Sequence, residues 1–118
     1  MSTKSGDALS IRIDLADGGR IGPGKIAVLE EIARAGSISA AGRALGMSYR
    51  RTWKLVEDLN RILGKPLVET AAGGPGGGGA SLTEAGRAVV ACYRAIEADG
   101  AAAARRHLAA LHRACRRK

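Results

Sequence analysis

The feature that most constrains this chain is a pair of short helical patterns joined by three residues, in the stretch SISAAGRALGMSYRRTWKLVEDLN at residues 37–60. Gly46 can adopt the left-handed backbone conformation that ends the first helix, and Ser48 is a favoured N-cap residue for the second. Two helices joined by so short a turn must cross and pack against each other. The stretch therefore predicts a helix-turn-helix whose second member is strongly basic.

The charge of the chain is concentrated in two places. Of the formal net charge of +8, the last 14 residues hold +6, with six basic residues and no acidic one. The second concentration is the stretch 32–56, which contains five basic residues and no Asp or Glu. Such a basic excess favours nucleic acid as a partner, and within the body of the chain it coincides with the two helices.

The segment before this pair predicts a strand and a helix. Residues 9–15 alternate apolar and polar side chains, which is typical of a half-buried strand, and a turn follows at 16–20. Helical spacing then predicts a helix over about 23–35. Its ends are marked by Pro23 in the first turn and Gly36 after the last residue.

The pair itself predicts a short helix through Leu45 and a longer one from Ser48 to about Leu63. Ser39 is expected to cap the short helix, and Trp53 is expected to lie in the core rather than to contact a ligand. The packing face of the short helix is predicted to be formed by Ala40, Ala41 and Ala44.

A wing and a long helix are predicted to follow. Residues 67–71 and 80–82 have the character of two short strands around a tip with six glycines, and Thr83 can cap a helix that runs to the end of the chain. The fold class is therefore α+β, mainly α: a winged helix-turn-helix with a small antiparallel sheet. We expect a DNA-binding domain over 1–82 and a C-terminal dimerisation helix with a basic tail over 83–118.

The first turns of the second helix of such a motif reach base edges in the major groove of double-stranded DNA, and the wing lies beside the backbone. The basic residues could instead form an ordinary solvated helix face, but the capped helices, the acid-free stretch and the wing favour contact with DNA. The residues predicted to bind DNA are Ser48, Tyr49, Arg50, Arg51 and Lys54 on the helix and Gly76, Gly77 and Gly78 in the wing.

The last helix carries an apolar stripe that has no evident surface to bury against in its own chain, which predicts a homodimer. The alternative is that Gly100 breaks the helix and leaves the basic end as a disordered arm. The residues predicted at the dimer interface are Val89, Tyr93, Ile96, Ala103, Leu108 and Leu111.

Several function classes receive no support. We find no arrangement of nucleophile, base or paired carboxylates typical of an enzyme, and no cofactor is expected. His107 and His112 are five residues apart, so their rings diverge on a helix and no metal site is expected. No apolar run is long enough for a membrane span, which predicts a cytoplasmic protein with Cys92 and Cys115 as reduced thiols.

Taken together, GSISAAGRALGMSYRRTWKLVEDLN and LVETAAGGPGGGGASLTEAGR resemble the N-terminal domain of the ModE-type molybdate-responsive transcriptional regulators, which is related to that of LysR-type regulators. The resemblance covers about residues 9–96. It implies a dimeric repressor or activator whose recognition helix and wing contact an operator. Such regulators bind molybdate in C-terminal domains rich in β-strands, and only one helix is predicted here after residue 83, so direct molybdate binding is not expected.

Two alternatives remain open at this point. The chain could bind nucleic acid without sequence specificity, mainly through its basic tail, or its winged helix could bind another protein.

Overall fold

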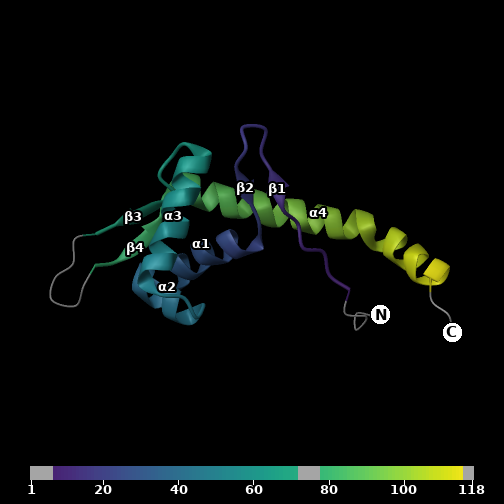
Figure 1. The fold of residues 1–118 in the computed structure, drawn as a ribbon, viewed down its shortest axis with the longest axis horizontal. Coiled ribbons are helices and arrows are strands. Elements are labelled where there is room, and N and C mark those ends of the chain that lie inside the picture. Colours follow the sequence, from purple (N-terminus) through teal and green to yellow (C-terminus); the bar gives the residue numbers. More distant parts are fainter. Residues whose placement is uncertain (1–6, 72–77, 116–118) are drawn as a thin grey trace.

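The computed structural model describes residues 7–71 and 78–115, which form four helices and two small antiparallel sheets (Figure 1). The molecule measures 61 × 31 × 21 Å, because the last helix extends far beyond the rest. The predicted fold class is confirmed. In chain order the elements are β1 (Ile13–Asp14), β2 (Arg20–Ile21), α1 (Pro23–Ala35), α2 (Ile38–Ala44), α3 (Tyr49–Leu63), β3 (Val68–Thr70), β4 (Ala80–Leu82) and α4 (Glu84–Cys115).

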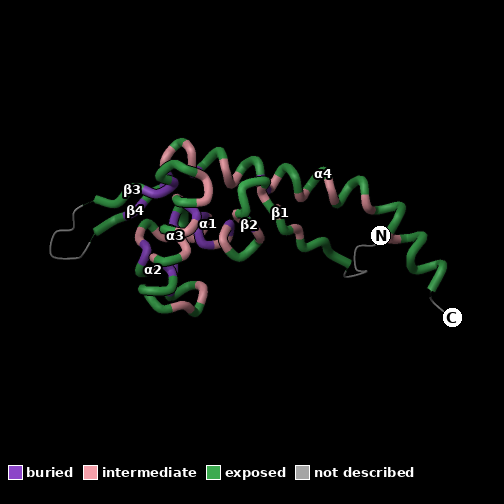
Figure 2. Tube along the Cα trace, turned by 45° about the horizontal axis from the view of Figure 1, so that its top comes forward, coloured by how far each residue is buried: buried purple, intermediate pink, exposed green. Residues whose placement is uncertain are grey.

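The core lies where α1 meets α2, α3 and the β3–β4 wing. Figure 2 shows the buried part of the chain gathered there, whereas the distal half of α4 is exposed along most of its length. Full burial of one such aliphatic side chain stabilises a fold by about 1.5–3 kcal/mol. The fully buried side chains at the centre of this core include Ile26, Val28, Leu29 and Ile32 of α1 and Val56 and Leu59 of α3.

The start of α2 differs from the prediction. The N-cap is Ser37, whose Oγ accepts a hydrogen bond of 3.0 Å from the Ala40 amide, so the expected cap at Ser39 is wrong. Gly36 has a left-handed φ of 80°, ends α1 and turns the chain directly into the next helix. Ser39 therefore lies inside α2, where its hydroxyl accepts a hydrogen bond from Arg43.

The packing face of α2 is also different from the predicted one. Ala41 is buried as expected, but Ala44 is exposed and Ala40 is only partly buried. The buried face is formed by Ile38, Ala41 and Gly42. Because Ile38 buries far more apolar surface than an alanine can, it determines which side of the helix faces the core.

The strand predicted at residues 9–15 is much shorter in the structure. Pairing is limited to Ile13 with Ile21 and Asp14 with Arg20. The residues before Ile13 lie instead along α4 (Figure 1), where the Ile11 carbonyl accepts a hydrogen bond from the Tyr93 hydroxyl. Alternation alone could not distinguish a strand from an extended segment that packs on a helix.

The wing is formed by β3 and β4, with Val68 opposite Leu82 and Thr70 opposite Ala80. Its base is attached to the helical core, because the Ala80 amide donates to the carbonyl of Gly36 at 2.8 Å. The prediction that Thr83 caps the last helix is confirmed: its Oγ1 accepts a 3.0 Å hydrogen bond from the Gly86 amide.

The last helix is continuous through Gly100, so the alternative that this glycine breaks it is wrong. Its 32 residues extend over about 48 Å. Cys92 and Cys115 on this helix are both exposed, and neither is part of a disulfide. Among the described residues, no helix combines the length and the apolar character needed to cross a membrane.

The correction at the start of α2 can be tested by replacing each of the two serines. Ser37→Ala removes the cap, and we expect the free energy of unfolding to fall by about 1 kcal/mol. Ser39→Ala removes only an exposed hydrogen bond to Arg43, and we expect a change within about 0.5 kcal/mol. Urea denaturation of the two variants measures the difference, and a larger loss for Ser39→Ala would contradict the assignment of the cap.

Candidate nucleic-acid interface

The start of α3 is fixed by local hydrogen bonds. Gly46 takes the left-handed conformation, with φ of 70°, and the chain re-enters a helix at Ser48. The Ser48 Oγ accepts from the Arg51 amide at 3.1 Å, and its carbonyl accepts from the Thr52 hydroxyl at 2.8 Å. The prediction of Ser48 as N-cap is confirmed.

The orientation of α3 depends on its close approach to α2 at Gly42. A Cβ atom at Gly42 would lie only 2.6 Å from Thr52 Oγ1 and 3.0 Å from the Met47 carbonyl oxygen. Thr52 is fully buried, so α3 cannot move away without opening the core. The small residue at Gly42 therefore allows the crossing that leaves one face of α3 exposed.

The exposed face of α3 carries all five residues predicted to bind DNA on this helix, namely Ser48, Tyr49, Arg50, Arg51 and Lys54. Among them Tyr49 is 57% exposed, although it is a large aromatic side chain. The structure thus places these residues together on one accessible surface.

The positive charges along α3 differ in how far they are compensated. Asp58 lies 3.0 Å from the Arg61 guanidinium and 3.6 Å from the Lys54 ammonium. The hydrogen bond from Arg61 lowers the pKa of the Asp58 carboxyl below its ordinary value. Within residues 7–71 and 78–115, the guanidinium groups of Arg50 and Arg51 form no ion pair, so their charge is available to a ligand.

A hollow of about 520 Å³ adjoins this face, between α2, the start of α3 and the wing. Trp53 was expected in the core. In the structure it is partly buried: it packs against the core and also lines the hollow. The hollow adds polar groups that were not predicted at the interface. They are Ser37, Ser39, Arg43 and Thr70.

Arg43 could have been identified from the sequence, because it belongs to the acid-free stretch 32–56. In the structure it is exposed and donates to Ser39 Oγ at 3.0 Å. Of the predicted wing residues, Gly78 is exposed and lines the hollow, whereas Gly76 and Gly77 lie outside the described residues.

The apolar stripe of α4 is divided between two environments. Tyr93 is 2% exposed and packs into the core of its own chain, so the expectation that the whole stripe lacks an intramolecular partner is wrong for this residue. Burial raises the pKa of its hydroxyl. Val89 also packs against the core, whereas Ala103 is exposed and Leu108 is partly buried. Ile96 and Leu111 are 45% and 55% exposed.

An apolar groove of about 220 Å³ lies beside this stripe, between the β1–β2 hairpin, the end of α3 and α4. Among the described residues, the only polar side-chain groups that line it are the Tyr93 phenol and the Cys92 thiol. Ile96 forms one edge, so the groove is continuous with the exposed part of the stripe. Its lining residues are Ile13, Ile21, Leu63, Ala88, Val89, Cys92, Tyr93 and Ile96.

The histidines of α4 do not converge on a metal site. His112 Nε2 lies 2.8 Å from the Asp7 carboxylate, at the start of the described chain. No group of three or more His, Cys, Asp or Glu side chains suited to a metal ion occurs in the part of the chain that the structure describes.

Residues 24–87, which extend from α1 to the first turn of α4, match the family described as bacterial regulatory helix-turn-helix protein, lysR family. The chain belongs to this family. The match contains the whole helix-turn-helix and the wing, and therefore every candidate DNA-binding residue identified above.

Curated relatives agree with the predicted ModE-type resemblance. The chain is 49% identical over 81 residues to the molybdenum-pterin-binding protein MopB of Rhodobacter capsulatus. The aligned region covers 69% of this chain and 30% of that protein. It is 43% identical to the molybdenum transport protein ModE of Azotobacter vinelandii, over 64% of this chain and 28% of that protein.

A third relative is described as the DNA-binding transcriptional dual regulator ModE of Escherichia coli K12, with 41% identity over 60% of this chain and 27% of that protein. The chain thus spans less than a third of the length of these relatives.

Two solved structures that contain DNA share the fold. The DNA-binding domain of CbnR in complex with DNA superposes with a TM-score of 0.56 and 28% identity, over 73% of this chain and 94% of that one. Full-length CbnR bound to its target DNA gives a TM-score of 0.53 and 26% identity, over 70% of this chain and 27% of that one.

The close approach of α2 and α3 generates a prediction for Gly42→Ala. The added methyl group meets Thr52 and the Met47 carbonyl, so we expect a loss of about 1–3 kcal/mol in the free energy of unfolding, despite the better helix propensity of alanine. Gly24→Ala in α1 is the control, since a Cβ there meets no atom within 4 Å. Thermal denaturation that shows equal stability for the two variants would contradict the proposed contact.

Proposed function

We propose that this chain is a DNA-binding transcriptional regulator that inserts α3 into the major groove of double-stranded DNA. The observation that carries the proposal is the pair of exposed and uncompensated guanidinium groups of Arg50 and Arg51 in the first turn of a capped helix. Arginine at such a position can donate two hydrogen bonds to the O6 and N7 atoms of guanine. The DNA complex of the CbnR domain supports double-stranded DNA as the ligand of this fold.

The proposed contacts divide into two groups. Tyr49, Arg50, Arg51 and Lys54 face the base edges, and Ser48 lies at the rim of the groove. The wing residues Gly76, Gly77 and Gly78 approach the phosphate backbone. The Arg43 guanidinium and the Ser39 hydroxyl, beside the hollow, are further donors for phosphate oxygens.

We also propose that the chain acts as a homodimer that contacts two half-sites about one helical turn apart. The support is the exposed apolar stripe of α4 together with the groove that adjoins it, since both would be buried by a second copy. The DNA-reading unit would then correspond to residues 1–82 and the dimerisation unit to 83–118. The proposed interface residues are Val89, Ile96, Ala103, Leu108 and Leu111, with Tyr93 supporting them from beneath.

The assignment of α3 to base recognition predicts unequal effects of three substitutions. Arg50→Ala and Arg51→Ala should each raise the Kd for a selected duplex by about 5- to 150-fold, the range of a lost bidentate base contact. Arg61→Ala is the matched control, because this side chain lies three turns along the helix and contacts Asp58. Fluorescence anisotropy on a duplex selected from random sequence, and on an unrelated duplex, measures the effects.

Equal losses on both duplexes would show that α3 does not read bases. That outcome would favour binding without sequence specificity, and failure of the protein to bind any duplex would favour a partner of another kind. The salt dependence of the Kd on the unrelated duplex counts the phosphate contacts.

If the chain forms the proposed dimer, charged residues introduced into the apolar stripe of α4 should dissociate the dimer. In the double variant Ile96→Glu, Leu111→Glu, both changed side chains are exposed in the protomer, so folding should be little affected. Burial of unpaired carboxylates at an interface is costly, and we expect the dimer dissociation constant to rise by about tenfold or more. Ala102→Glu, at an exposed position on the opposite face of α4, is the control. A wild-type chain that sediments as a monomer would contradict the dimer.

A further inference from the structure

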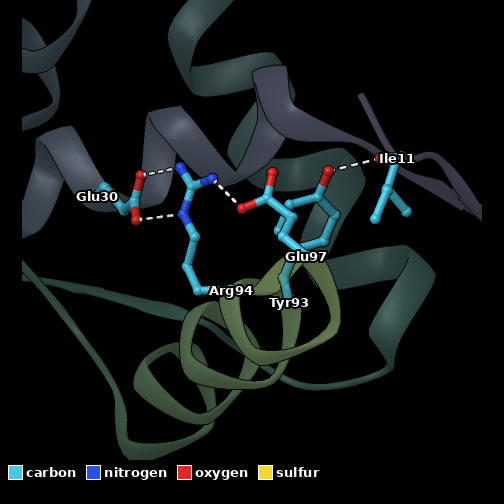
Figure 3. Close-up of polar contacts among 5 residues, drawn as sticks. All are labelled: Ile11, Glu30, Tyr93, Arg94 and Glu97. Carbon is cyan, nitrogen blue, oxygen red and sulfur yellow. Dashed lines mark hydrogen bonds and ion pairs between the residues drawn. The ribbon is translucent and has the colours of Figure 1, made fainter. Parts of the chain in front are cut away.

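A bidentate ion pair joins α4 to α1. The Arg94 Nε atom donates to Glu30 Oε2 at 2.8 Å, and its Nη2 atom donates to Glu30 Oε1 at 2.5 Å (Figure 3). The third guanidinium nitrogen, Nη1, donates to Glu97 on the next turn of α4. A planar guanidinium bound through two parallel hydrogen bonds accepts only a narrow range of orientations of the carboxylate.

The adjacent residue holds α4 from another direction. Tyr93 is buried, and its hydroxyl donates to the Ile11 carbonyl of the N-terminal segment, whereas Arg94 points towards α1 (Figure 3). Successive residues on a helix project about 100° apart. Two neighbouring residues, Tyr93 and Arg94, therefore hold the helix from two sides. Together the two contacts oppose a tilt of α4 towards or away from α1.

Because most of α4 lies beyond Tyr93 and Arg94, a small tilt of the helix at these two residues moves its distal end by a large distance. The helix continues for 21 residues beyond Arg94, or about 32 Å. Its distal part is accompanied by the N-terminal segment, through Ile11 beside Gly100 and Asp7 beside His112. A tilt of about 10° at Arg94 would displace the end of the helix by about 6 Å, which exceeds the rise of about 3.4 Å per base pair of DNA.

The other partner of the pair belongs to the unit that holds α3. Glu30 lies between Leu29 and Ile32 on α1, and both of these are fully buried in the core that α1 shares with α3. The Glu30 carboxylate therefore joins α4 to the helix that packs against α3, in addition to the core contacts of Val89, Val90 and Tyr93.

We propose that the Arg94–Glu30 pair, together with the Tyr93–Ile11 contact, is a positioning device that sets the angle between α3 and α4 and thereby the half-site spacing that the dimer selects. This inference rests on the proposed function. In the proposed role, neither Arg94 nor Glu30 contacts DNA. Both residues act by positioning α3. The pair determines which spacing is bound, and the side chains of α3 determine which bases are read.

The test uses the full chain and duplexes with two copies of a half-site, obtained by selection with the wild-type protein and separated by spacers that change in steps of one base pair. We expect the wild-type protein to bind one spacing about tenfold more tightly than the spacings on either side of it. Glu30→Gln keeps the size of the side chain and Arg94→Lys keeps the positive charge, but both lose the bidentate geometry. In each variant this preference should fall to about threefold or less.

Two controls separate positioning from folding. Glu31→Gln breaks the pair between Glu31 and Arg34 on the same helix and should retain the wild-type spacing profile. Binding to a single half-site should stay within about twofold of wild type in Glu30→Gln and Arg94→Lys, because α3 is unchanged. Circular dichroism during thermal denaturation verifies that each variant is folded.

Unchanged spacing profiles in both variants would overturn the inference, as would a loss of single half-site binding equal to the loss on the paired sites. A wild-type protein that binds a half-site without any spacing preference would overturn the inference while DNA binding stands. A wild-type protein that binds no duplex would instead overturn the proposed function.

Discussion

The contact between Gly42 and Thr52 is the constraint on which the remaining structure depends. It brings α2 and α3 so close that no side chain fits between them, and it orients α3 with one face in the core and the other in solvent. The short turn through Gly46 can close only at this separation, since the Met47 amide donates to the Gly42 carbonyl at 2.8 Å. Among the described residues, the only aromatic side chains in the core are Tyr93 and, in part, Trp53. The contact between Gly42 and Thr52 fixes how the helices around this core pack.

The long helix α4 both completes the core and exposes an apolar stripe to solvent. Its first three turns complete the core through Val89, Val90 and Tyr93. The remainder leaves the core and presents Leu111 and its neighbours to solvent. The ion pair of Arg94 lies at the transition, where it lowers the pKa of the Glu30 carboxyl through hydrogen bonding. Because both side chains are about 40% exposed, water screens this pair, and its directionality matters more than its contribution to stability.

Local chemistry explains which parts of this fold could be predicted from the sequence. Ser48 and Gly46 were predicted correctly because a cap and a left-handed turn depend on a few neighbouring residues. The cap of α2 was misassigned because Ser37 and Ser39 are equally good caps by composition, and only the end of α1 at Gly36 decides between them. Tyr93 was assigned to an intermolecular surface because its partner, Ile11, lies 82 residues away. The pair of Arg94 and Glu30, 64 residues apart, likewise leaves no local signal.

The contact between Ile11 and Tyr93 also determines the order in which this chain can assemble during synthesis. The helix-turn-helix and the wing involve residues up to Leu82, so most of the core can close before α4 is available. The segment around Ile11 is made earlier than any of these elements, yet its binding surface exists only after residues 93–100 have been added. The part of the described chain that is synthesised first is therefore among the last to dock.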